Sequence, residues 1–182
     1  MECWRIFQKM SKFYLQLWSL WALRVVLCTL VFATLFTTIV TLIIYAKQGF
    51  APLNSDVVVA LEKVFIFWFL IFVNLALLLA LFRSIKYLFN RCYSGYMFKL
   101  KSCNQKEGEY LEAIGYGDLL RVWRKWFMLL IWIVSAMMLF AFIGSFFNIY
   151  FLYGAIIVAG YPSFMILSAR CKNVKVVKCS FT

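Results

Sequence analysis

Four long apolar runs divide the chain, and short polar stretches separate them. The runs cover about residues 25–45, 57–82, 126–146 and 149–168. A helix needs roughly 20 apolar residues to cross the hydrocarbon core of a bilayer, and every run reaches that length. We therefore expect an all-α integral membrane protein with four transmembrane helices.

The polar connections predict how these helices pair. Residues 46–56 contain Gly49, Pro52 and Asn54, which favour turns. An even shorter turn separates the last two runs. Short connections favour antiparallel neighbours. We therefore expect two transmembrane hairpins, one over residues 23–82 and the other over residues 126–168. Residues 83–125 would then form a basic cytoplasmic loop or small cap, and residues 169–182 a basic cytoplasmic tail.

The first 22 residues have a different pattern, in which basic and apolar side chains interleave. Phe13, Leu17 and Leu20 recur at helical spacing, and so do Met10 and Tyr14. A basic amphipathic helix of this kind lies in the membrane interface, with its aromatic side chains at the acyl boundary. We expect residues 1–22 to form such an interfacial helix.

Basic residues predict which way the helices face. The chain has 19 Lys and Arg against 7 Asp and Glu, a net charge of +12. All but Lys47 and Lys63 flank the apolar runs on the side that holds both termini. Because cytoplasmic loops are enriched in Lys and Arg, we expect a multi-pass inner-membrane protein with both termini in the cytoplasm. We expect its basic residues to contact anionic lipid headgroups rather than nucleic acid. The residues expected to anchor the protein at the membrane surface are Arg5, Lys9, Lys12, Arg83, Lys86, Arg121, Arg124 and Lys125.

Small and polar side chains recur every four residues inside two of the runs. These stripes let neighbouring helices approach closely, and a mid-membrane amide such as that of Asn74 favours an interhelical hydrogen bond. The pattern predicts helix packing in a homo-oligomer, with a polar pore lining as the alternative. The residues concerned are Thr29, Ala33, Thr37, Thr41, Asn74, Ala155, Ala159 and Ser163.

The polar segment between the two hairpins alternates opposite charges and carries tyrosines. Such a surface offers contact area and charge complementarity to a soluble protein. We expect a cytosolic partner to bind at Lys99, Lys101, Lys106, Tyr110, Glu112, Tyr116 and Asp118. Gly115 and Gly117 are expected to interrupt any helix, and Asp118 to cap the third helix.

Catalytic and metal-binding signals are weak. The chain has no histidine, the commonest general base and metal ligand. The six cysteines include no C-x-x-C pair, so zinc at Cys92, Cys103, Cys171 and Cys179 is only a minor alternative. On the predicted topology no cysteine faces an oxidising compartment, and we expect free thiols. We expect no enzyme activity and no cofactor.

Three functions fit this layout. The favoured one is a non-enzymatic membrane scaffold or sensor that oligomerises and holds a cytosolic partner at the inner membrane. An oligomeric channel is the alternative, and an enzyme acting on lipids is the weakest of the three. The layout of four spans with a basic cytoplasmic face resembles the membrane subunits of bacterial antiphage systems such as Kiwa. Colicin immunity proteins and conjugative entry-exclusion proteins are similar in layout, and the resemblance covers architecture alone.

Overall fold

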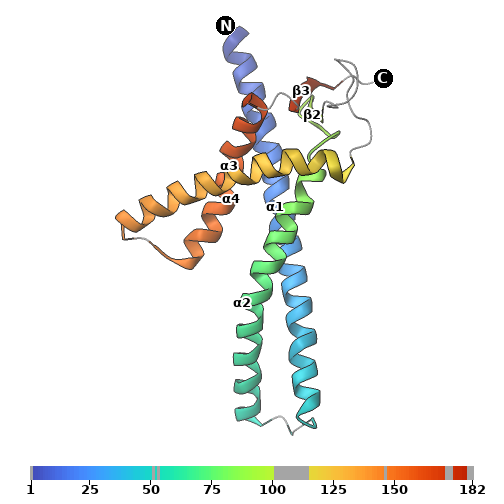
Figure 1. The fold of residues 1–182 in the computed structure, drawn as a ribbon, viewed down its shortest axis with the longest axis vertical. Helices are drawn as coiled ribbons and strands as arrows, with labels where there is room; N and C mark the ends of the chain where they lie inside the picture. The colour runs from blue at the N-terminus through green and yellow to red at the C-terminus, as the bar shows by residue number, and fades with distance from the viewer. Residues whose placement is uncertain are drawn as a thin grey trace. The chain divides into compact units, whose positions relative to one another are not determined.

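The described residues of the computed structural model form four long helices and one small sheet (Figure 1). The helices are α1 (Glu2–Lys47), α2 (Ser55–Lys86), α3 (Tyr116–Ile143) and α4 (Ile149–Arg170). The strands are β1 (Cys92–Tyr93), β2 (Tyr96–Leu100) and β3 (Val174–Lys178). The structure describes residues 2–50, 52, 54–100, 115–145, 147–170 and 174–179.

Each of the four helices is long and apolar enough to cross a membrane. Their outer surfaces carry large apolar side chains, for example Leu79, which is 67% exposed, and Phe140, which is 76% exposed. Soluble proteins rarely expose apolar surface continuously along whole helices. The predicted helical class and the four candidate spans are confirmed, and they suggest a multi-pass membrane protein.

The chain divides into two compact units. One consists of residues 23–84 and holds most of α1 and α2. Within it the rings of Phe36 and Phe72 lie 5.8 Å apart, so the two helices touch. The other unit consists of residues 1–22 and 85–182, and it holds the start of α1, the sheet, α3 and α4.

Aromatic rings form the core of the second unit. Trp126 of α3 stacks on Phe164 of α4 at 5.7 Å between centroids, and Trp21 of α1 meets both rings edge-on at 5.7 and 5.3 Å. Phe13 of α1 packs in the same way against Phe98 of β2 at 5.4 Å. All five side chains are at most 1% exposed. Rings of this size contribute much of the apolar surface that a core buries.

Two polar contacts also hold the start of α1 against α4. The indole Nε1 of Trp18 donates to the carbonyl oxygen of Ile157 at 2.8 Å. The hydroxyls of Tyr14 and Ser168 form a hydrogen bond of 2.6 Å. Both bonds satisfy polar groups that burial would otherwise leave without water.

The apolar side chains near the N-terminus therefore pack in a protein core, which the sequence did not predict. Residues 1–22 do not form a helix of their own, because α1 continues without a break to Lys47. Phe13, Leu17 and Trp21, spaced by four, are buried in the unit's core, while Leu20 is 46% exposed. An apolar stripe with helical spacing fits a protein core as well as a lipid interface, and periodicity cannot distinguish the two.

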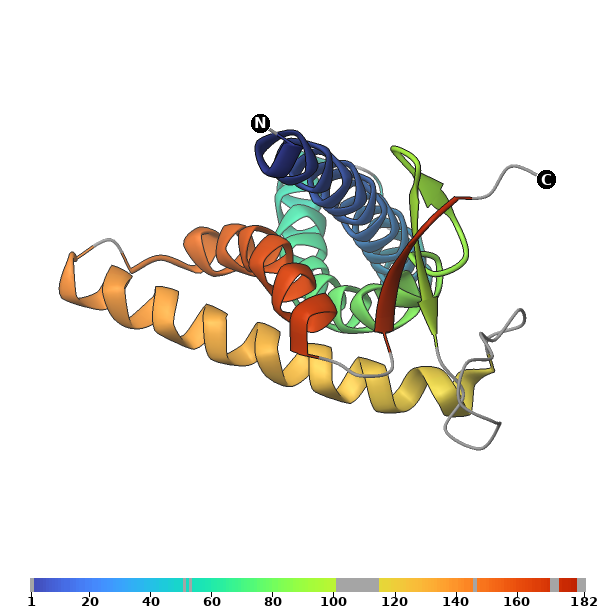
Figure 2. The same cartoon turned by 90° about the horizontal axis from the view of Figure 1, so that it is seen from above.

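The loop expected between the hairpins contains a hairpin of strands instead. Ser94 and Gly95 have φ angles of +51° and +83° between β1 and β2. Two successive positive φ angles are typical of the tight turn whose twist matches paired strands. Strand β3, from the predicted tail, completes an antiparallel sheet in the order β1-β2-β3 (Figure 2).

The predicted start of the third helix was wrong. Helix α3 begins at Tyr116, and Gly115 occupies the N-cap position without a side-chain hydrogen bond. Asp118 thus lies inside the first turn and does not cap the helix. Glycine is tolerated at an N-cap, so the two glycines did not delay the helix as expected.

Helix α4 approaches the Trp21 ring at Gly160 so closely that a Cβ atom there would overlap the ring. At Gly154 of the same helix a Cβ would meet nothing within 4 Å. We predict that Gly160→Ala lowers the stability of the protein in detergent by about 1–3 kcal/mol because of overpacking. Gly154→Ala is the matched control and should be neutral or raise it by up to about 1 kcal/mol. Thermal unfolding monitored by tryptophan fluorescence measures both, and equal effects of the two variants would contradict the predicted overlap.

Candidate functional site

The two faces of the small sheet differ in character. Strand residues alternate between faces, and Phe98, Leu100 and Val174, which share one face, are at most 2% exposed. Phe98 of that face packs on Phe13 of α1. The opposite face, called here the outer face, carries Met97, Lys99, Lys175 and Val177, none of which is fully buried.

Two lysines lie directly opposite each other on the outer face. The register of β2 and β3 pairs Lys99 with Lys175. Side chains at such paired positions have Cβ atoms about 5 Å apart, and like charges there are destabilising. Among the described residues of the strands and of the loop that leads into them, every charged side chain is basic, and these are Arg91, Lys99, Lys175 and Lys178. The outer face is thus suited to an anionic ligand.

The structure places only part of the predicted partner surface. Lys99 lies on β2. Tyr116 and Asp118 lie in the first turn of α3, and their side chains are outside the described residues. Lys101, Lys106, Tyr110 and Glu112 also lie outside the described residues. Sequence reasoning missed Lys175, although the alternation of valine and lysine in residues 174–178 is a strand signal.

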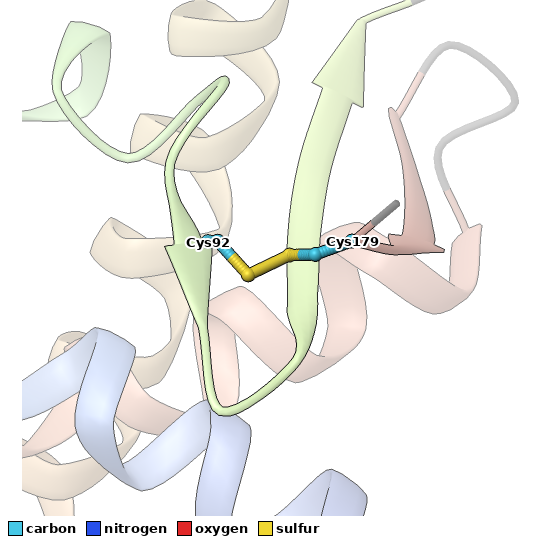
Figure 3. Close-up of a disulfide and its surroundings, with 2 residues drawn as sticks. All are labelled: Cys92 and Cys179. Atoms are coloured by element: carbon cyan, nitrogen blue, oxygen red, sulfur yellow. A yellow bond between two sulfur atoms is a disulfide. The ribbon is translucent and has the colours of Figure 1, made fainter. Parts of the chain in front are cut away.

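A disulfide crosses the sheet, contrary to the expectation of free thiols. Cys92 and Cys179 are 87 residues apart in the chain, and their Cα atoms lie 6.1 Å apart (Figure 3). That separation is within the range that a disulfide requires. The backbone N–H of Cys179 donates to the carbonyl oxygen of Gly95 at 2.9 Å, which holds this end of the chain at the hairpin turn. The pairing depends on strand register, which cysteine spacing does not reveal.

The same pairing removes two of the four cysteines of the zinc alternative. Cys103 and Cys171 lie outside the described residues. Within the part of the chain that the structure describes, no group of three or more His, Cys, Asp or Glu could hold a metal ion.

The predicted membrane-anchoring residues lie at the surface wherever their side chains are described. Lys86 is half-buried, and the others are exposed, namely Lys12, Arg83, Arg121, Arg124 and Lys125. Arg5 and Lys9 belong to α1, and their side chains are outside the described residues. Arg121, Arg124 and Lys125 share the face of α3 that is opposite the buried Val122 and Trp126.

The small-residue stripes are buried within the single chain. Ala155, Ala159 and Ser163 of α4 are at most 2% exposed, and Ser163 donates its hydroxyl to the carbonyl oxygen of Gly160. Ala33 and Thr37 of α1 are fully buried. Their small size serves close packing inside the molecule.

Threonines of α1 fall into two classes. The exposed Thr34 and Thr38 each donate to a carbonyl oxygen one turn earlier at 2.8 Å, as is usual in membrane helices. The hydroxyl oxygens of Thr29, Thr37 and Thr41 are buried and have no hydrogen-bond partner among the described residues. A buried polar atom without a partner costs free energy, so these three positions form an unsatisfied polar row along one face of α1.

Asn74 of α2 is exposed, and its amide nitrogen donates to the carbonyl oxygen of Leu70 of the same helix at 2.7 Å. It lies 11 residues after Lys63 and 9 before Arg83, or about 16 Å and 14 Å along the helix. The amide is therefore near the middle of the apolar stretch of α2.

Comparisons with known proteins identify no relative. No protein-family model matches the chain, and no curated protein and no solved structure is significantly similar to it.

Proposed function

We propose that this protein is a non-enzymatic membrane scaffold or sensor subunit that oligomerises and holds or regulates a cytosolic protein at the inner membrane. The observation that carries the proposal is the outer face of the sheet, where Lys99 and Lys175 stand opposite each other in a chain with four apolar helices. Bacterial antiphage, exclusion or immunity systems are a setting in which small membrane subunits of this kind serve a neighbouring protein.

Charge supports the orientation in which both termini and the sheet are cytoplasmic. The strands, the start of α3 and the tail are basic, whereas the connection between α1 and α2 holds only Lys47 with Asp56 close by. This asymmetry is the one that sets the orientation of multi-pass proteins. The four helices would then cross as two antiparallel hairpins, and the sheet would belong to a small cytoplasmic cap beside the interfacial start of α1.

The chemistry of the outer face favours an acidic protein segment as the partner. A carboxylate placed between Lys99 and Lys175 would form a charge-assisted hydrogen bond with each of the two ammonium groups. Met97 and Val177 on the same face offer apolar contact beside the charges. Charged surfaces of this kind contribute most to the association rate and to partner choice.

Asn74 supports self-association better than the small-residue stripes do. The stripes are buried inside the chain, whereas the amide of Asn74 is exposed near the middle of α2. Amides also hydrogen-bond between membrane helices, and the same amide of a second copy both donates and accepts such bonds. The bond of Asn74 to Leu70 within α2 leaves room for this additional contact. Two copies related by a twofold axis would bring these amides together.

An oligomeric channel is the second candidate, and the unsatisfied row of Thr29, Thr37 and Thr41 favours it. Hydroxyls without partners would be satisfied by water or by a permeating ion. The outer face of the sheet would then regulate opening instead of recruiting a protein.

The orientation predicts opposite behaviour for two reporter fusions. Alkaline phosphatase, which is active only in the periplasm, should be inactive after Thr182 and active when inserted at Asn54. The charge distribution is the reason, because the basic segments remain in the cytoplasm. Activity of the fusion after Thr182, with none at Asn54, would show the reverse orientation.

If the outer face binds the partner, Lys99→Glu should reduce the recovery of the cytosolic partner at least about tenfold. The contacts of Lys99 and Lys175 with the partner's carboxylate would both be lost. The fold should survive, since the new carboxylate faces Lys175 and forms a favourable cross-strand pair. Affinity purification from native-level expression, followed by quantitative mass spectrometry, measures the recovery. Lys47→Glu makes the same charge change in the connection between α1 and α2 and serves as the control. Unchanged recovery with Lys99→Glu would exclude the outer face as the docking site.

The two candidate functions predict different results for Thr37→Val, which keeps the shape of the side chain and removes its hydroxyl. If Thr37 only packs, stability in detergent should rise by about 1–3 kcal/mol, since an unsatisfied buried group is removed, and ion flux into liposomes should not change. A channel requires measurable flux through the wild-type protein that Thr37→Val reduces. Thr34→Val is the control, because that hydroxyl bonds within its own helix.

A further inference from the structure

The disulfide lies on the same outer face as the opposed lysines. Cys92 is paired in register with Met97, and Cys179 follows Val177 by two residues. Alternation along the strands therefore places both cysteines on the face of Met97, Lys99 and Lys175. Strands β1 and β3 are not neighbours, because β2 lies between them. The disulfide is thus a covalent bridge over the central strand, as Figure 3 shows.

The charge of this face and its disulfide are typical of different cellular compartments. The concentration of Lys and Arg favours the cytoplasm. Cytosolic thiols are kept reduced by dithiol systems, and disulfides there are transient, catalytic or redox-sensing. A cytoplasmic face can carry this disulfide if the bond between Cys92 and Cys179 forms and breaks as the redox state of the cytosol changes.

We propose that Cys92 and Cys179 form a reversible thiol–disulfide exchange site that controls whether β3 stays fastened on the sheet. This inference rests on the cytoplasmic orientation proposed above. The oxidant is a small disulfide such as glutathione disulfide, and the reductant is a thiol or dithiol of the cytosol.

The exchange is balanced in two steps. One cysteine thiolate attacks the small disulfide, forming a mixed disulfide and releasing one small thiolate. The thiolate of the other cysteine then attacks the protein sulfur of the mixed disulfide, which forms the Cys92–Cys179 bond and releases the second small thiolate. The protein loses two electrons and two protons, and the oxidant becomes two thiols. The cytosolic reductant reverses both steps.

The surroundings of the pair suit this chemistry. Cys92 is exposed and Cys179 is half-buried, so a small disulfide can reach the site. The described charged residues of the sheet are all basic, and Lys99 and Lys175 lie on the same face as the two cysteines. The thiolate is the attacking species in this exchange. Exposed disulfides are also the ones that cellular thiols reduce most readily.

The bridge has a mechanical consequence for β3. This strand has five residues, and within the described part of the chain its one neighbour in the sheet is β2. Lys175 lies opposite Lys99 across that pairing. The covalent bond, together with the Cys179 N–H bond to Gly95, holds the end of β3 at the hairpin turn. Oxidation therefore keeps the two lysines paired on the outer face, and reduction lets β3 leave the sheet.

Thiol labelling in cells tests the exchange. Cys3, Cys28, Cys103 and Cys171 are replaced by Ser in the full chain, so that Cys92 and Cys179 alone react with a maleimide that adds mass. We expect two tags in unstressed cells, none after treatment with the thiol oxidant diamide, and two again after the oxidant is removed. The same chain with Cys92→Ser should keep its single tag throughout.

Two results would overturn the proposal. One leaves the cytoplasmic orientation standing, and the other excludes it. Two tags that persist through diamide treatment would show that the pair does not form, and the cytoplasmic orientation would stand. No tags in unstressed cells, with tags appearing only after a membrane-impermeant reductant is added from the periplasmic side, would show a permanent disulfide in the periplasm. The latter would also exclude the proposed orientation, and the fusion after Thr182 would then be active.

Proteolysis of the purified full chain tests the effect on β3. Trypsin should cleave after Lys175 on the order of tenfold faster in the reduced protein than in the oxidised one, because cleavage requires local opening of the strand. Cys179→Ser should be cleaved at the fast rate in both conditions, and Cys28→Ser should behave as the wild type. Equal cleavage of the oxidised and reduced wild type would contradict control of β3 by the bridge.

Discussion

The packing of Trp21 against Gly160, Trp126 and Phe164 is the interaction on which the second compact unit depends. It joins the start of α1 to α3 and α4, which follow about 100 residues later in the chain. The absence of a side chain at Gly160 is what allows the indole ring to approach. Lipid does not drive apolar helices together, because its tails are as apolar as leucine, so close packing and polar contacts must do so. The ring contacts, with the hydrogen bonds of Trp18 and Tyr14, supply both.

The sheet extends this core to a surface that can meet water. Phe98 of β2 packs on Phe13 of α1, so the core of the sheet is continuous with that of the helices. Its other face is free of acidic side chains among the described residues and carries two lysines in register. The proposed recognition of an acidic partner would use this pair, and the neighbouring disulfide fastens the end of the strand that carries Lys175.

Local signals predicted much of this architecture and missed parts whose meaning depends on distant residues. Run length identified the four helices, since length and apolarity are local properties. Ser94 and Gly95, which lie between two tyrosines, are also a local signal and indicate a tight hairpin. This signal was missed because the segment was interpreted from its basic charge. By contrast, Phe13, Leu17 and Trp21 have the same spacing whether they face lipid or protein. Only the presence of Phe98, Trp126 and Phe164 decides between the two.

The sequence by itself determined the helical class, the four apolar segments and the uneven distribution of charge, because each is a sum over neighbouring residues. The tertiary structure alone decided that β3 lies beside β2, that Lys175 faces Lys99 and that Cys92 meets Cys179. These pairings join segments about 80 residues apart, and they follow from strand register. Register depends on which face each strand buries against the core, and that choice is made only when the whole unit packs.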